Sequence, residues 1–165
     1  SKIGPRFTMK RQLDDYLQQF YGKLYARTQV LRKSRFSAAR DLATWKQMVA
    51  ERWEGVHLLE KDVFDSDNFS LHFGESFKVR IKVAHNGIPK EQLGMEAIFF
   101  KRLSEHELDL RFHKELQVVD SNEYSTTFAA EIFPQVSGVY EYGFRLYPRH
   151  ELLPHKQDLC LVKWV

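Results

Sequence analysis

The sequence predicts an α+β chain, in which an N-terminal pair of amphipathic helices is followed by an immunoglobulin-like antiparallel β-sandwich of about seven strands. Apolar residues recur at steps of three and four up to about residue 53, and at steps of two after it. The charge changes at the same place, because residues 1–52 carry 12 Lys or Arg and 4 Asp or Glu, whereas residues 53–165 carry 13 and 18. We therefore expect a helical segment over residues 1–53 and a sandwich domain over residues 54–165.

The first helix is predicted to run from Thr8, a suitable N-cap residue, to about Leu24. Its apolar stripe consists of Met9, Leu13, Tyr16, Leu17, Phe20, Tyr21 and Leu24. Two helices and a sandwich leave much of this stripe uncovered. We therefore expect a larger protein body to cover the stripe, or the chain to self-associate through its helices when that body is absent.

The second helix is predicted from Ser37, as N-cap, to Glu51. Leu42, Trp45, Met48 and Val49 form its apolar face, and three alanines raise its helix propensity. The basic residues 32–35 are interpreted as the connection between the two helices.

The clearest strand spans residues 77–83, where Phe, Val, Ile and Val alternate with Lys and Arg. Further strands are expected at residues 56–61, 95–101, 112–119, 124–132, 140–146 and 158–165. Tyr140 follows Gly138 at the start of a strand, which is the usual setting of a tyrosine corner. We predict that its hydroxyl pins the crossover between the two sheets.

No motif for catalysis, cofactor binding or metal binding is apparent in the sequence. The seven histidines form neither an HxH nor an HExxH pair, and there is no glycine-rich phosphate loop and no Gly-x-Ser-x-Gly elbow. The acidic residues Asp62, Asp65 and Asp67 lack the glycine of a calcium-binding EF-hand loop and are interpreted as a solvated loop. We therefore predict no catalytic, cofactor-binding or metal-binding residue in this chain.

A single cysteine, Cys160, excludes an internal disulfide and a cysteine zinc cluster. The simplest interpretation is a reducing, cytoplasmic setting. Because Cys160 alternates with Val162 and Trp164, we expect it to be buried. No apolar run approaches the roughly 20 residues that span a bilayer, so no membrane contact is expected.

The basic, aromatic helical half invites a nucleic-acid interpretation, but its aromatic residues lie on the helix stripe, which favours packing in a core. No nucleic-acid partner is therefore expected. Trp164 and Tyr147 are candidates for stacking on sugar rings, and the alternative for both is packing between sheets or domains.

Residues 5–21, PRFTMKRQLDDYLQQFY, look like the closing helix of α-glucan phosphorylases. Residues 138–155 and the final Val162-Lys163-Trp164 are similar to the extreme C-terminus of the bacterial and archaeal long-chain branch. The chain thus resembles the C-terminal region of a bacterial glycogen, starch or maltodextrin phosphorylase, a glycosyltransferase of the GT-B type. Gln12 departs from the apolar residue that is usual at its position.

The resemblance implies a parent enzyme with two Rossmann-like lobes and pyridoxal phosphate held by a lysine. That parent would use inorganic phosphate to release glucose 1-phosphate from α-1,4-glucan. The cofactor-lysine motif is absent here and is expected upstream of Ser1, so no catalytic residue is carried over.

We accordingly expect this chain alone to be inactive, with the rest of the parent chain as its partner and the sandwich as a structural or accessory domain. The alternative is a glucan-binding module of a carbohydrate-active enzyme, with α-glucan as a second partner.

Overall fold

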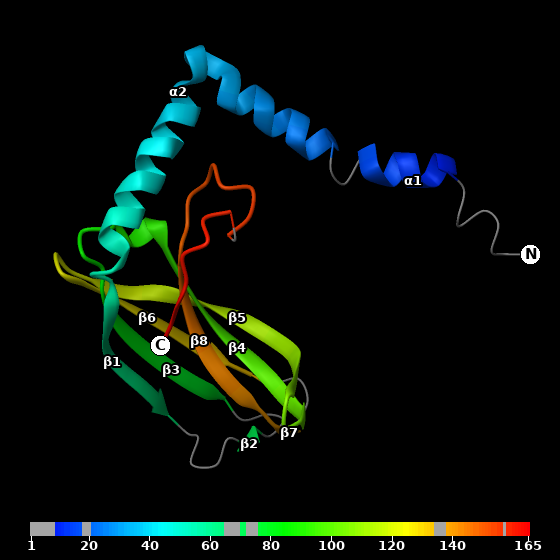
Figure 1. Ribbon diagram of the computed structural model, residues 1–165. Coiled ribbons are helices and arrows are strands. Elements are labelled where there is room, and N and C mark those ends of the chain that lie inside the picture. Colours follow the sequence, from blue (N-terminus) through cyan, green and yellow to red (C-terminus); the bar gives the residue numbers. More distant parts are fainter. Residues whose placement is uncertain (1–8, 18–20, 65–69, 72–75, 134–137, 157) are drawn as a thin grey trace, which may run out of the picture. The chain divides into compact units, whose positions relative to one another are not determined.

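The computed structural model describes residues 9–17, 21–64, 70–71, 76–133, 138–156 and 158–165 (Figure 1). The chain divides into two compact units, Ser1–Lys46 and Gln47–Val165, which are described separately. Two α-helices, α1 (Met9–Tyr16) and α2 (Gly22–Trp53), precede the strands, as predicted. Helix α2 contributes to both units.

The bounds of the two helices differ from the prediction. Helix α1 ends at Tyr16, α2 already begins at Gly22, and the expected connection at residues 32–35 lies inside α2. Arg35 and Phe36 have left-handed φ values of 55° and 62°, so the regular backbone is interrupted just before Ser37. The capping residue Thr8 lies outside the described residues.

The apolar stripe of the first unit is exposed. Met9, Leu13, Leu17 and Leu24 are between 55% and 71% exposed, and α1 has no buried residue. The C-terminal half of α2 differs from this stripe, because its predicted face residues Leu42, Trp45 and Val49 are buried, as is Trp53.

The second unit is built on a seven-stranded antiparallel sheet with the order β1-β3-β6-β5-β4-β8-β9. Its strands are β1 (His57–Phe64), β3 (Phe77–Ala84), β4 (Leu93–Ser104), β5 (Glu107–Ser121), β6 (Ser125–Ile132), β8 (Glu141–Pro148) and β9 (Lys163–Trp164). The two-residue strands β2 (Ser70–Leu71) and β7 (Gly138–Val139) pair with each other, and η3 (Lys90–Gln92) precedes β4.

The long strand β5 joins two halves of this sheet and lets it curl into a half-barrel (Figure 1). Its residues up to Leu116 pair with β4, and its residues from Gln117 pair with β6. If the seven main strands are lettered A to G along the chain, one half has the order ABED and the other CFG. This is the strand order of an immunoglobulin constant domain, so the predicted sandwich-like fold is confirmed.

Alternating residues fill the space between the two halves. Phe77 on β3 and Phe99 on β4 are fully buried, and their ring centroids lie 5.6 Å apart in an edge-on arrangement. Each such ring stabilises the fold by about 1.5–3 kcal/mol through burial. The rings therefore hold the halves together where no backbone hydrogen bonds join them.

A group of hydrogen bonds attaches the end of α2 to the sandwich within the second unit. Asn86 and Gly87 form a turn with φ values of 46° and 73°, and Asn86 Nδ2 donates to the carbonyl oxygen of Arg52 at 2.8 Å. Arg52 Nη1 donates to the carbonyl oxygen of Gly87 at 2.6 Å. Lys163 Nζ donates to the carbonyl oxygen of Val56 at 2.7 Å. The bonds from Asn86 and Lys163 satisfy carbonyls at or just beyond the end of α2.

The last predicted strand is much shorter than expected, since only Lys163 and Trp164 pair with β8. The alternation assumed for residues 158–165 therefore does not apply before Lys163. As a result Cys160 is exposed, and the expectation that it is buried was wrong.

Candidate functional site

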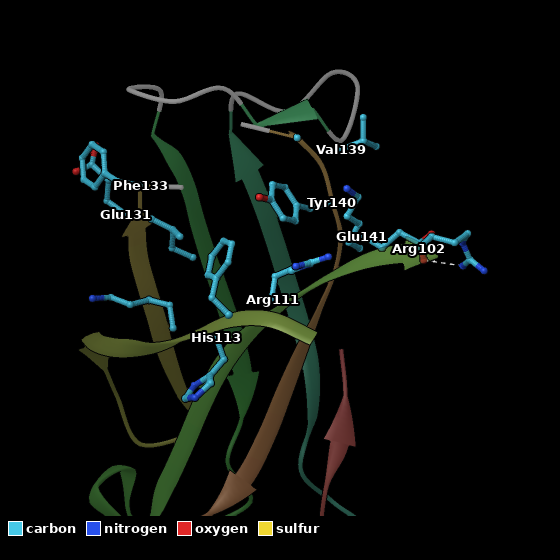
Figure 2. A pocket seen from close by; sticks show the side chains of 13 residues that line it. Arg102, Arg111, His113, Glu131, Phe133, Val139, Tyr140 and Glu141 are labelled. Carbon is cyan, nitrogen blue, oxygen red and sulfur yellow. Dashed lines mark hydrogen bonds and ion pairs between the residues drawn. The ribbon is translucent and has the colours of Figure 1, made fainter. Parts of the chain in front are cut away.

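A cavity of about 850 Å³ lies where the two halves of the sheet separate. The pairings recorded for the described residues join Glu107–Leu116 to β4 and Ala130–Ile132 to β3, so these two segments diverge from each other. Figure 2 shows Glu131 and Phe133 at one side of the cavity, Arg102 and Glu141 at the other, and Tyr140 and Arg111 between them. The two halves of the sheet separate here because β5 changes its pairing partner from β4 to β6.

An aromatic wall forms the inner side of the cavity. Phe112 stacks on Phe99 with 4.4 Å between ring centroids and 14° between ring planes. Tyr140 meets Phe112 edge-on at 5.7 Å and is buried. Since each ring is held by the next, the wall is a rigid surface rather than a set of mobile side chains.

Arg111 owes its position to a β-bulge. Phe99 pairs with Phe112 and Phe100 pairs with Leu110, so Arg111 is the extra residue on β5. A bulge re-aims the side chain it carries. The guanidinium lies against Asp109, with Nη2 2.9 Å from Oδ2, and it also lines the cavity.

Two lysines occupy positions that face the inside of the half-barrel. Lys114 is paired with Ala97, which is fully buried, and Lys101 is two residues beyond the buried Phe99 on β4. Residues opposite each other on paired strands share a face, so both positions are inward, where a sandwich normally places apolar residues. Both lysines line the cavity and are exposed through its opening.

Arg102 and Glu141 form an ion pair at the rim of the cavity. Arg102 Nη2 donates to Glu141 Oε2 at 2.7 Å, and Nε donates to the other carboxylate oxygen. The hydrogen bond from Arg102 holds the pKa of Glu141 below its usual value. Because both side chains are well exposed, this pair contributes little to stability.

The outer face of the second half carries a buried carboxylate. Glu96 on β4 is 1% exposed, and Arg145 Nε donates to its Oε1 at 2.6 Å. Lys156 Nζ donates to Oε2, and His113 Nδ1 lies 3.6 Å from the same oxygen. Burial raises the pKa of Glu96, but the hydrogen bonds and charges of Lys156 and Arg145 outweigh that effect and lower it.

The two predicted sugar-stacking residues lie on this outer face in different environments. Tyr147 is buried, with Lys156 Nζ 5.2 Å from its ring centroid and Gly94 so close that a Cβ there would lie 2.5 Å from the ring. Burial raises the pKa of Tyr147 to about 12. Trp164 is 59% exposed, and a Cβ at Gly143 would lie 3.1 Å from its ring.

The structure therefore does not gather the three predicted site residues together. Tyr140 belongs to the cavity, whereas Trp164 and Tyr147 belong to the outer face. Sequence reasoning missed Arg111, Lys114 and Glu96. A signal for Lys114 was present, because it interrupts the apolar alternation of Phe112, Leu116 and Val118.

Within the described residues, no group of three or more His, Cys, Asp or Glu side chains is placed to hold a metal ion. A search of the same residues finds no helix that is long and apolar enough to cross a membrane.

The fold is a helical segment joined to an immunoglobulin-like sandwich, and the cavity lies within the sandwich. A profile of the glycogen phosphorylase C-terminal domain matches residues 53–165, and the chain belongs to that family. A maltodextrin phosphorylase of Thermococcus litoralis is 25% identical over 166 residues, which covers 98% of this chain. The chain spans only 19% of that relative's length.

Proposed function

We propose that this chain is the C-terminal, non-catalytic part of a cytoplasmic α-glucan phosphorylase, with the helical segment closing the catalytic lobes and residues 54–165 forming an accessory domain. The parent enzyme would bind pyridoxal phosphate upstream of Ser1 and cleave α-1,4-glucan with phosphate. Family membership and the relative's coverage support this assignment.

The observation that carries the proposal is the exposed apolar stripe of α1 and the start of α2. Met9, Leu13, Leu17 and Leu24 repeat at helical spacing and are all more than half exposed. Such a stripe is unfavourable in water unless another surface covers it. The aligned region of the maltodextrin phosphorylase includes nearly the whole chain, so the helices are shared with a much longer protein.

Amide hydrogen exchange tests the proposal directly. In the complete gene product, exchange in residues 9–17 should be slower by at least about tenfold than in this 165-residue chain, because docking protects the helix. The isolated chain should bind no pyridoxal phosphate and release no glucose 1-phosphate. A gene product that begins near Ser1, or a stoichiometric cofactor in this chain, would overturn the proposal.

A second candidate function is glucan binding by the outer face, with Trp164 as the stacking residue. Gly143 lets the indole lie close to the sheet, and Trp164 as a whole is 59% exposed. A flat, exposed aromatic ring is a suitable platform for the apolar face of a sugar. Tyr147 has little exposed ring to offer and is expected to support this face rather than to stack on glucan.

Affinity electrophoresis in gels with glycogen tests the second candidate. The wild-type chain should be retarded, Trp164→Ala should migrate freely, and the exposed Tyr124→Ala should remain retarded as a control. Tyr147→Phe should keep the retardation, since it preserves the buried ring. Unchanged mobility of the wild type with and without glycogen would rule out this function.

We also propose that Tyr140 acts as the tyrosine corner of the sandwich. Its burial and its position at the start of β8, which corresponds to strand F, support this role. Tyr140→Phe should lower the free energy of unfolding by about 1 kcal/mol through loss of the hydroxyl contact. An unchanged unfolding midpoint in urea would argue against the corner.

A further inference from the structure

We propose that the cavity between the two halves of the sheet binds a sugar phosphate. The assignment comes from three properties of its lining: an excess of inward-facing cations, a rigid aromatic wall, and two diverging strand edges. The choice of a sugar rests on the proposed function, whereas the choice of an anion rests on the lining alone.

The charge of the cavity is opposite to that of the domain around it. Residues 53–165 carry 18 Asp or Glu and 13 Lys or Arg, yet the lining has four Lys or Arg and two Glu. The two glutamates have nearby cations, since Glu141 pairs with Arg102 and Glu131 lies 3.6 Å from Lys78. Lys101 and Lys114 make no recorded ion pair within the described residues, and Asp109, which lies opposite Lys101 on β5, pairs with Arg111. A positive cleft in an acidic domain attracts and concentrates anions.

These cations occupy positions at which a sandwich normally places apolar side chains. Lys114 replaces the apolar residue expected between Phe112 and Leu116 on the inner face. A bulge brings Arg111 to the same opening, where Asp109 orients its guanidinium. Bulges are over-represented next to active sites, where they re-aim a side chain, as well as at the edges of sheets.

The aromatic wall suits a ring with an apolar face. Phe112 is held by its stack on Phe99, and Phe133, which also lines the cavity, has 61% of its surface exposed. A pyranose can pack its C–H face on such a ring while its phosphate reaches the lysines. The volume of about 850 Å³ is within the range of small-molecule sites.

The backbone supplies partners for hydroxyl groups. In the described part of the chain, Glu107–Leu116 have β4 as their only recorded strand neighbour, and Ala130–Ile132 have only β3. The edges that face the split thus present N–H and C=O groups to a polar ligand. Bare inorganic phosphate would use the cations but neither the edges nor the wall.

Titration calorimetry on the 165-residue chain tests the proposal, with glucose 1-phosphate and glucose 6-phosphate as probes. At least one should bind saturably with a Kd below about 1 mM, and binding should weaken as salt is raised. Inorganic phosphate and maltose should each bind at least about tenfold more weakly. Absence of binding by both hexose phosphates, or equal binding of inorganic phosphate, overturns the proposal.

Variants locate the site. Lys114→Gln and Lys101→Gln should each weaken binding by roughly tenfold, because each removes a charge-assisted hydrogen bond to phosphate. Phe112→Leu should weaken the hexose phosphate without affecting inorganic phosphate. Lys90→Gln, in η3 just before β4 and outside the cavity lining, is the matched control and should bind like the wild type. Thermal unfolding verifies that each variant is folded.

Two outcomes separate this inference from its alternatives. Unchanged affinity in both lysine variants places any binding elsewhere and overturns the site. Tighter binding of adenosine monophosphate than of either hexose phosphate overturns the sugar assignment. Because the proposed function is tested by exchange in α1 and this site by binding to the isolated chain, either can fail without the other.

Discussion

At the scale of single residues, Glu96 is the charged side chain that the described part of the domain buries most deeply. Its carboxylate is nearly inaccessible, but Arg145 and Lys156 approach from the same face and are themselves partly exposed. A buried charge is tolerated only when it is paired and hydrogen-bonded. Lys156 donates to Glu96 and also lies over the ring of Tyr147. The carboxylate of Glu96 therefore links the sheet to the segment that follows β8.

Glu96→Gln should lower the free energy of unfolding by about 2–3 kcal/mol at about pH 7, because two cations lose their shared partner. Urea unfolding monitored by fluorescence measures this change. Glu141→Gln removes a carboxylate from an exposed ion pair and should have little effect. Equal losses in the two variants would show that the burial of Glu96 does not matter.

Glu96→Gln should also make the free energy of unfolding less dependent on pH in the acidic range. The pKa of Glu96 lies below its ordinary value of 4.5 in the folded state, so its stabilisation is complete above 4.5 and is lost as the pH falls through the folded pKa. The difference between wild type and Glu96→Gln should therefore shrink as the pH falls below 4.5 and through the folded pKa of Glu96. A constant difference across this range would contradict the assigned ion pairs.

Tyr147 should ionise at a higher pH than an ordinary tyrosine. Burial raises its pKa to about 12 from 10.0, so the neutral phenol stabilises the fold and this contribution is lost as pH rises from 10.0 towards 12. A phenolate absorbance titration should show a late step that Tyr147→Phe removes. A variant with the same late step would assign it to another tyrosine.

At the scale of elements, the second unit is organised by two strand-level features. The partner change of β5 opens the cavity, and the turn at Asn86-Gly87 attaches α2 to the sandwich. The turn depends on a backbone conformation that favours particular residues. Asn and Gly tolerate the left-handed region that this turn requires.

Variants of Asn86 and Gly87 separate the effect of the turn conformation from the effect of the hydrogen bond to the Arg52 carbonyl. Asn86→Gly keeps the turn conformation but loses the bond to the Arg52 carbonyl, and should cost about 0.5–1.5 kcal/mol. Gly87→Ala keeps that bond but strains a residue with φ of 73°, and should cost about 1–2 kcal/mol. Thermal unfolding followed by circular dichroism measures both. If neither variant lowers the midpoint, the turn does not anchor α2.

At the scale of the whole molecule, the two units differ in whether their apolar side chains are buried or exposed to water. The second unit buries an aromatic core between the halves of its sheet, whereas the first presents an apolar stripe. This difference follows from what each unit contains, since a sheet that curls on itself can cover its own inner face and a single helix cannot.

The isolated chain should therefore self-associate as its concentration rises. Leu13→Lys combined with Leu24→Lys should shift the sedimentation profile towards monomer, because the stripe loses its apolar continuity. Leu108→Lys, an exposed leucine at the β4–β5 hairpin, is the matched control and should associate like the wild type. Association that persists in the double variant would place the contact outside the helices.

Sequence periodicity by itself determined the change from helix to strand near residue 53, the six longer strands of the main sheet and the core face of β3. These are local properties, set by whether apolar residues recur every 3.6 or every two positions. The partner change of β5, the cavity it opens, the burial of Glu96 and the exposure of Cys160 were decided only by the tertiary structure. Each depends on which distant segment lies alongside, and the order of residues along one strand does not specify its neighbour.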